Sequence, residues 1–294
     1  MRPDGRARRN RGSPPTETDS EVTLSVTTAT LNLSDGFAPV ENLYSGAHAR
    51  QGAYTRVTST AINVTGGTYG RVYGGGWGEN YGKSEVGSST ISVSGGTLGY
   101  IYAGGGNAKN GTTVTGNVTI SITDDANVGI VFLAGKNQNC SVEGAATLTL
   151  SGGTKTMSRI SGWNANGKAS SGLSTLDLQT SLNVDYLDNV DVIRIAENST
   201  LDVSTHLWYE AAAALKIDFD LDGAEADWVA MSGADFLEDD FNLIRSAQYT
   251  INGGTTTYAY NATTGELGNS GCYLDIDTTE NKIRFHTTGT IANS

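Results

Sequence analysis

The 294-residue chain has few prolines and few charged residues, and it has no long apolar run. Its 4 prolines and 38 glycines favour short strands joined by turns over helices, because glycine has poor helix propensity and is common in turns. Only 17% of the residues are charged, which excludes a charge-rich disordered chain. No run of about 18 apolar residues occurs, so we expect no membrane span in this chain.

Cysteine and histidine are also scarce, and they form no motif for metal binding, redox chemistry or catalysis. Cys140 and Cys272 lie in different parts of the chain. We expect both to be unpaired, with a disulfide between them as the alternative. The histidines His48, His206 and His286 are isolated from one another, so we expect surface or edge residues rather than general bases.

Positive charge is in short supply as well. There are 19 Lys and Arg against 31 Asp and Glu, which gives a net charge of -12 and argues against nucleic acid as the main partner. The Arg-rich residues 1–12 are followed by no hydrophobic stretch, so this segment is not typical of a secretory signal. We expect residues 1–20 to form a disordered tail.

What the chain does have is a repeat. Seven short segments carry a Thr followed by two aliphatic residues that flank one polar residue, and only the second copy has Ala in place of Thr. The first aliphatic residue recurs every 25 to 31 residues, and a period of this length is typical of stacked structural units. The segments cover residues 30–33, 61–64, 90–93, 119–122, 147–150, 175–178 and 200–203.

Each repeat carries further features of one coil of a parallel β-helix. A turn follows the first strand, as at Gly66-Gly67, and a second apolar strand leads to another glycine, as at Gly75. A polar stretch of variable sequence and a short third strand complete the unit. We therefore predict an all-β fold, with a right-handed parallel β-helix of about seven coils over residues 21–210 and a non-repeating β cap or continuation of the solenoid over residues 211–294.

The two aliphatic residues of each repeat are predicted to stack in columns inside the coil, because side chains two residues apart lie on one face of a strand. The polar residue between them then points outward. The inward columns are Leu31, Ile62, Ile91, Ile120, Leu148, Leu176 and Leu201, and Leu33, Val64, Val93, Ile122, Leu150, Leu178 and Val203. A further column is predicted from Tyr44, Tyr73, Tyr102, Leu133 and Ile160.

Beyond residue 210, apolar runs and a period of two predict more strands. A block of this kind protects the last coil of a solenoid, whose edge is otherwise open. The predicted strands cover residues 215–221, 228–231, 241–244, 249–251, 256–260, 273–276 and 282–285.

The glycine-rich coil at residues 91–106 reads Ile-Ser-Val-Ser-Gly-Gly-Thr-Leu-Gly-Tyr-Ile-Tyr-Ala-Gly-Gly-Gly. It resembles repeats of large bacterial surface proteins, including the β-helical passengers of autotransporters and adhesin-like proteins. Residues 215–222 and 227–233 resemble the closing strands of such passengers. The resemblance covers roughly residues 22–290, and it implies a secreted or cell-surface protein without a defined catalytic motif.

Asp218, Asp220 and Asp222 have the spacing that opens a calcium-binding loop, and Asp227 offers a further carboxylate. The acid expected at the twelfth position of such a loop is replaced by Val229. Alternation along a strand also places these aspartates on one solvated face without any metal. We therefore expect no cofactor, with calcium at these four aspartates as the alternative.

Two other sets of side chains are candidates for chemistry or binding. Asp124-Asp125 stands where other coils have Gly-Gly, so we expect a turn substitution, with half of a glycosidase-like acid pair as the alternative. Trp77, Tyr81 and Trp163 fall in polar loops, where exposed aromatic rings suit stacking on sugar rings.

Our leading hypothesis is a non-enzymatic extracellular or cell-surface scaffold, an adhesin-like module whose loops contact a host or microbial surface glycan or protein. Solenoids bind through faces built from the insertions of successive coils, which supports this placement. The alternative is a polysaccharide-degrading β-helix enzyme, either a lyase or a tailspike-like glycosidase. The predicted contact loops cover residues 46–58, 76–88, 105–116, 136–145 and 163–173.

Overall fold

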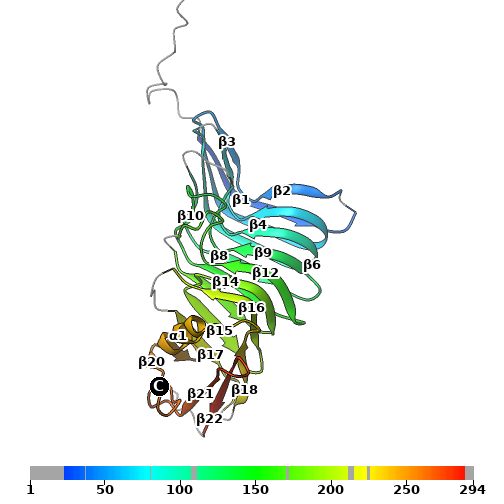
Figure 1. The fold of residues 1–294 in the computed structure, drawn as a ribbon. Helices are drawn as coiled ribbons and strands as arrows, with labels where there is room; N and C mark the ends of the chain where they lie inside the picture. Colours follow the sequence, from blue (N-terminus) through cyan, green and yellow to red (C-terminus); the bar gives the residue numbers. More distant parts are fainter. Residues whose placement is uncertain are drawn as a thin grey trace, which may run out of the picture.

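The structure is a computed structural model, and it describes residues 23–36, 38–79, 81–106, 111–169, 172–210, 215–223 and 226–288. These residues form a parallel β-solenoid of about seven turns, as predicted (Figure 1). Twenty of the described strands belong to one sheet, and two short strands form a second one. The tail predicted at residues 1–20 lies outside the described residues.

The first stack of parallel strands contains the repeat segments from residues 30–33 to residues 175–178. It runs from one coil to the next without a change of direction. Its members are β1 (Thr23–Leu33), the first half of β4 (Tyr54–Tyr73), the first half of β6 (Lys83–Tyr102), β8 (Val118–Ile122), β11 (Ala146–Leu150), β13 (Ser174–Leu178), β15 (Val192–Ala196), β17 (Lys216–Asp220) and β19 (Gln248–Ile251).

The second stack follows the glycine turn of each coil and is also parallel. The turn needs a positive φ, which Gly67 and Gly96 supply, and Asp124 adopts the same kind of backbone at φ 47°. The members are β2 (Val40–Tyr44), the second halves of β4 and β6, β9 (Asn127–Phe132), β12 (Lys155–Ser161), β14 (Leu182–Asp188), β16 (Leu201–Trp208) and β18 (Asp227–Ser232).

Loops that we call the arms connect the second stack of one coil to the first stack of the next. They contain β3 (His48–Arg50), β5 (Trp77–Glu79), β7 (Thr112–Val114) and β10 (Cys140–Val142). Glycines let the outgoing and returning halves of an arm lie against each other. A Cβ at Gly76 would stand 2.0 Å from Ser84 Oγ, and one at Gly105 would stand 2.0 Å from Thr112 Oγ1.

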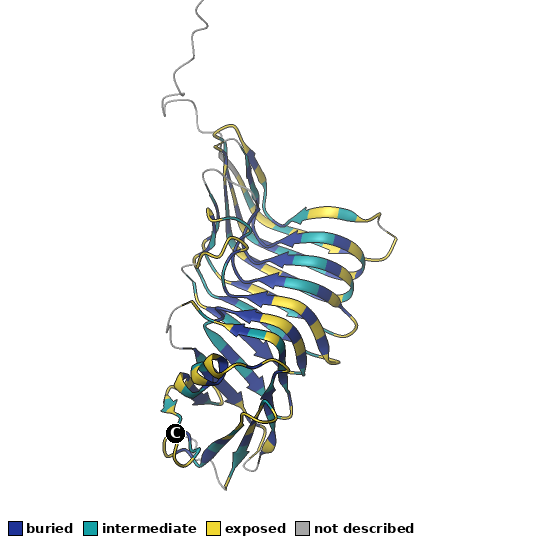
Figure 2. Cartoon of the chain, in the orientation of Figure 1, coloured by how far each residue is buried: buried dark blue, intermediate teal, exposed yellow. Residues whose placement is uncertain are grey.

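The core is a set of aliphatic columns inside the coil, and Figure 2 shows buried and exposed residues alternating along the coil strands. The predicted residues from Ile62 to Leu176 stack in register and are fully buried. Each such side chain contributes roughly 1.5–3 kcal/mol relative to exposure, so the columns are the main stabilising feature. The stacked members are Ile62, Ile91, Ile120, Leu148 and Leu176.

The last predicted member of each inward column is wrong. Leu201 and Val203 are buried, but they belong to the second stack, where they pair with Leu182 and Val184. The coils become shorter after residue 178, so the seventh copy of the motif falls on a strand of the second stack instead of the first. Strands of the second stack also place alternate apolar side chains in the core, so the pattern fits there as well. The first column instead continues through Ile193, Ile217 and Tyr249.

The C-terminal block combines a continuation of the solenoid with antiparallel strands. The first stack continues into β17 and β19, while β18 pairs with β22 (Lys282–Thr287), which in turn pairs with β21 (Cys272–Asp277). The short β20 (Tyr258–Ala259) pairs with β19. Protection of the last coil by this block stays a prediction.

The strand predicted at residues 241–244 is wrong, because this segment lies in helix α1 (Glu238–Ser246). Phe241 and Ile244 are buried three residues apart, which is a helical spacing rather than a strand spacing. Three acidic residues stand in the first turn and Arg245 in the last, which suits the helix dipole.

Cys140 and Cys272 are both buried and unpaired, which confirms the expectation for the cysteines. In the part of the chain that the structure describes, no helix has the length and apolarity needed to cross a membrane.

Candidate functional site

The three aromatic residues predicted for ligand contact all lie on the arms, Trp77 and Tyr81 on one arm and Trp163 on the arm of a later coil. Trp77 is half-buried in β5, and its ring meets that of Tyr44 edge-on at 5.2 Å. Tyr81 is 63% exposed, and its φ of 71° is a left-handed backbone conformation typical of turns. Trp163 is partly buried, and its ring meets that of Trp208 edge-on at 6.3 Å. The structure therefore places Trp77 and Tyr81 on one arm and Trp163 farther along the solenoid, and none of the three borders the pocket described below.

Between the arms and the second stack runs a ladder of stacked rings, which we call the aromatic column. The centroid distances are 4.5 Å for Tyr44 and Tyr73, 4.9 Å for Tyr73 and Tyr102, and 5.3 Å for Tyr102 and Phe132, with nearly parallel planes. Tyr73, Tyr102 and Phe132 form a buried cluster separate from the main core. The spacing is close to the distance between neighbouring strands, so register alone brings the rings together.

The predicted membership of this column is partly wrong. Phe132, not Leu133, pairs with Tyr102, because Val131 is the inward residue opposite Ile101. Ile160 pairs with Val131 and lies in the main core. Beyond Phe132 the column becomes polar and then ends on a tryptophan, through Ser161, Asp188 and Trp208.

Cations flank the column on its solvent side. The Arg71 guanidinium lies 5.6 Å from the centroid of Tyr100, and that of Arg159 lies 5.7 Å from the centroid of Phe132. Arg159 also donates from Nε to Asp188 at 2.7 Å. Burial raises the pKa of Tyr44 to about 12, so this phenol is neutral and can donate a hydrogen bond. The ring faces of Tyr73, Tyr102 and Phe132 are covered by their neighbours, so the column offers solvent its partly exposed arginines rather than free ring faces.

The four aspartates predicted as calcium ligands take part in separate interactions. Asp218 is buried and accepts hydrogen bonds from Arg194 Nε at 2.8 Å, Thr250 Oγ1 at 2.6 Å and Gly253 N at 3.0 Å. Asp227 pairs with Arg284 Nη1 at 2.7 Å. Asp220 and Asp222 are exposed on and just after β17.

Among the described residues, no group of three or more His, Cys, Asp or Glu side chains is placed to hold a metal ion. The carboxylate of Asp218 is already saturated by donors, so it is poorly suited to be a ligand. Calcium at these four aspartates stays a prediction.

Asp218 belongs to a buried polar ladder that the sequence pattern did not reveal. In consecutive strands of the first stack, Asp177 pairs in register with Arg194, and Arg194 with Asp218. Thr149 donates from Oγ1 to Asp177 at 3.3 Å. Burial raises the pKa of Asp177, while Arg194 and the hydrogen bond from Thr149 oppose this effect. The sequence does hold a signal for this ladder, because the equivalent positions of three consecutive strands are an acid, a base and an acid.

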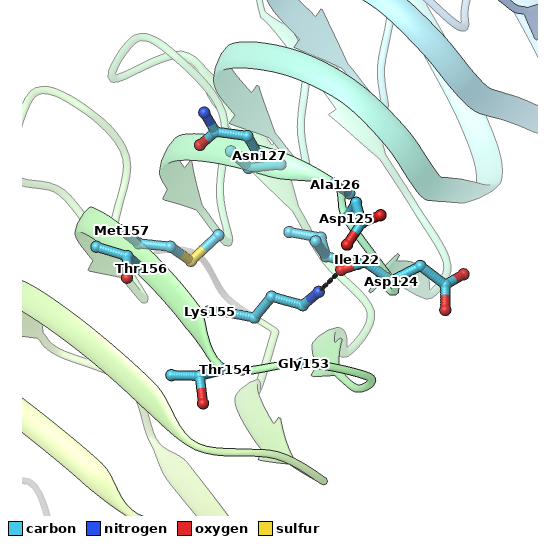
Figure 3. Close-up of a pocket in the computed structure, with 11 residues that line it drawn as sticks. Ile122, Asp124, Asp125, Ala126, Asn127, Gly153, Thr154, Lys155, Thr156 and Met157 are labelled. Atoms are coloured by element: carbon cyan, nitrogen blue, oxygen red, sulfur yellow. Dashed lines mark hydrogen bonds between the residues drawn. The ribbon is translucent and has the colours of Figure 1, made fainter.

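A pocket of about 280 Å³ opens at the turn that carries Asp124 and Asp125. The turn belongs to one coil, and the opposite wall, residues 153–157, belongs to the next coil. Lys155 is 5% exposed, and its ammonium donates a hydrogen bond to the carbonyl of Asp124 across the pocket (Figure 3). The Asp124 carboxylate points away from this lysine and accepts a hydrogen bond from Thr123 Oγ1 at 3.0 Å. Asp124 and Asp125 are therefore adjacent in a turn, as expected, and they also border a cavity.

The three histidines lie beside single carboxylates. His48 Nε2 is 3.4 Å from Glu79, and His286 Nδ1 is 3.4 Å from Asp275. His206 Nδ1 is 3.8 Å from the buried Asp240. None of these pairs borders the pocket at Asp124.

Comparisons with known proteins do not assign the chain to a family. The chain matches no protein-family model, no curated protein and no solved structure at a significant level.

Proposed function

We propose that the protein is a non-enzymatic extracellular or cell-surface scaffold of the adhesin-like kind, which holds a glycan or protein of a host or microbial surface against its arms. The observation that carries this proposal is the row of arms on successive coils, which present the half-buried Trp77, the 63% exposed Tyr81 and the partly buried Trp163. Exposed aromatic rings on polar loops suit stacking on the faces of sugar rings. The resemblance of the glycine-rich coils to bacterial surface repeats supports the location.

A binding screen against immobilised glycans and whole bacterial or host cells tests this function. The doubly substituted chain with Tyr81→Ala and Trp163→Ala removes two aromatic side chains of the arms. We expect it to lose about tenfold or more in affinity for whatever the natural chain binds. Tyr186→Ala is the matched control, because Tyr186 is 47% exposed on the second stack, away from the arms. Absence of any binding by the natural chain, or an equal loss in the control, would contradict the proposal.

A polysaccharide-degrading activity is the second candidate, and the pocket at Asp124 and Asp125 favours it. Two carboxylates and a buried lysine border a cavity large enough to admit a sugar residue. Incubation with neutral and acidic polysaccharides, followed by assays for new reducing ends and unsaturated products, distinguishes the two functions. Turnover that Asp124→Asn or Asp125→Asn abolishes would establish an enzyme.

A further inference from the structure

Lys155 is a charged residue at a position where the next coils have a buried leucine. It pairs in register with Leu182, which pairs in turn with Leu201, and both leucines are fully buried. The equivalent position of the preceding coil, counted back from the pair of Arg159 and Ile130, is Ala126. A lysine therefore occupies an inward column, beside a residue that carries only a methyl group.

The presence of Lys155 and Ala126 in place of two leucines leaves the space that forms the pocket. Ala126 is too small to fill the space that a leucine would take, and the Lys155 stem crosses it to reach the Asp124 carbonyl (Figure 3). No ion pair joins Lys155 to any carboxylate of the described residues, and the carbonyl is the partner of its ammonium. An ammonium has three N–H donors, and buried lysines are rare unless they are paired. The site thus holds donors that an oxygen-rich occupant would satisfy.

The other walls define the chemistry of that occupant. Asp125 offers carboxylate oxygens at the rim, which the exposed Asn127, Thr154 and Thr156 also border. Met157, with Ile122 and Val128, supplies an apolar wall. A sugar ring has the same division, because its hydroxyls lie around an apolar C–H face.

The charge and the volume of the pocket restrict the class of ligand further. Asp124 and Asp125 outweigh the single charge of Lys155, and the whole chain carries a net charge of -12, so an anionic ligand is repelled. The volume of about 280 Å³ lies at the lower limit for small-molecule pockets. One neutral ring fits these limits better than a charged or an extended ligand.

We propose that the pocket between the turns at residues 123–126 and 151–154 binds one neutral pyranose residue of a glycan, with Lys155 and Asp125 as its hydrogen-bonding pair. The turns join the first stack to the second, whereas the arms join the second to the first. The site is therefore at a different edge of the coil from Trp77 and Trp163, and the inference does not depend on the proposed role of the arms.

Titration calorimetry with the full chain tests the site, with methyl α-mannoside, methyl β-galactoside and methyl β-glucoside as probes. We expect at least one of them to bind in the millimolar range. Methyl β-glucuronide, the charged counterpart, is expected to bind about tenfold or more weakly than the best neutral probe. Absence of binding by all three neutral glycosides, or tighter binding of the glucuronide, would overturn the proposal.

Two variants locate the site. Lys155→Met keeps an unbranched apolar stem in the leucine column, so we expect the fold to persist and the affinity for the best neutral probe to fall about tenfold. Lys168→Met is the control, because Lys168 is an exposed lysine on an arm, and it should leave the affinity unchanged. Should Lys155→Met fail to fold, Asp125→Asn at the exposed rim replaces it and should weaken binding severalfold. Unchanged affinity in a folded Lys155→Met chain, or in Asp125→Asn where that variant replaces it, would show that the probe binds elsewhere.

Discussion

At the scale of single residues, this protein places charges inside its stack where they satisfy one another from coil to coil. Asp177, Arg194 and Asp218 follow in consecutive strands of the first stack. Because parallel strands keep residues in register, one base can serve the acid above and the acid below. Removing Arg194 would leave two acids without their cation, which is the costly case, whereas Arg194 stays paired with Asp218 when Asp177 loses its charge.

Asp177→Asn should raise the free energy of unfolding at neutral pH by up to about 1 kcal/mol. Burial raises the pKa of Asp177, so the folded state favours the protonated acid and loses this stabilisation as pH rises through that pKa. The gain from asparagine should therefore shrink as the pH falls from neutrality towards 4, because a larger fraction of the natural side chain is then protonated. Urea denaturation at both pH values measures it.

The control for this prediction is Asp235→Asn, since Asp235 is exposed and stands after the end of β18. It should show little effect at either pH. A gain at Asp177 that does not change between neutral and acidic pH would contradict the role of burial.

Gly105→Ala should lower the free energy of unfolding by about 1–3 kcal/mol, as overpacking does in a filled core. The new Cβ would stand 2.0 Å from Thr112 Oγ1 and 2.7 Å from the Gly76 carbonyl oxygen, so both halves of the arm must separate. Gly223→Ala is the matched control, because nothing lies within 4 Å of its Cβ position. Thermal denaturation of both variants measures the difference, and equal melting temperatures would show that the arms yield easily.

At the scale of elements, the sequence predicted the strands well and their partners less well. The period-two pattern identified the columns of Ile62 to Leu176, because burial on one face of a strand requires it. It misplaced Leu201, because both stacks use the same inward pattern and only the shortening of the coils tells them apart. The helix at Phe241 was missed because a short apolar run is compatible with either period.

The candidate site was less predictable than the fold. Trp77, Tyr81 and Trp163 were correctly placed on the connecting loops, and the structure puts Trp77 and Tyr81 on one arm and Trp163 on the arm of a later coil. Lys155 was not singled out, because its position in the leucine column becomes visible only when it pairs with Leu182.

Phe132→Ala should lower the free energy of unfolding by about 3 kcal/mol, since it removes a buried ring between Tyr102 and Arg159. Phe132→Tyr should be tolerated, because the neighbouring positions of the aromatic column already hold tyrosines in the same stacking geometry. Chemical denaturation of the pair measures the contribution of the ring. A tyrosine variant as unstable as the alanine variant would show that this end of the column admits no hydroxyl.

At the scale of the whole molecule, the solenoid is stabilised by contacts between neighbouring coils. Each inner coil of the described residues pairs with the one before and the one after it, and the aliphatic columns run through the stack. Stability in such an arrangement is roughly a sum over coils and the interfaces between them. The period of the sequence is enough to predict this architecture. The C-terminal block does not repeat, so no period shows how its strands pair.

The melting temperature should be the same in EDTA and in millimolar calcium. A ligand that binds only the folded state raises the melting temperature, and the predicted calcium ligands are divided among separate interactions, with Asp218 tied to Arg194. Differential scanning calorimetry in the two buffers makes the comparison. A clear upward shift in calcium would support a metal site at Asp220, Asp222 and Asp227.

The offset between β4 and β6, which is the same on both sides of a register shift at Thr65, has a consequence for how such a chain changes length over evolutionary time. Ile62 stands opposite Ile91, and Tyr73 opposite Tyr102, so the two coils are interchangeable in their contacts. Excision of residues 62–90 would join two half-coils in register, and a tandem duplication of the same stretch would insert another coil. The solenoid would shorten or lengthen in steps of about 4.8 Å, so replication slippage can adjust its length while the inward columns stay aligned.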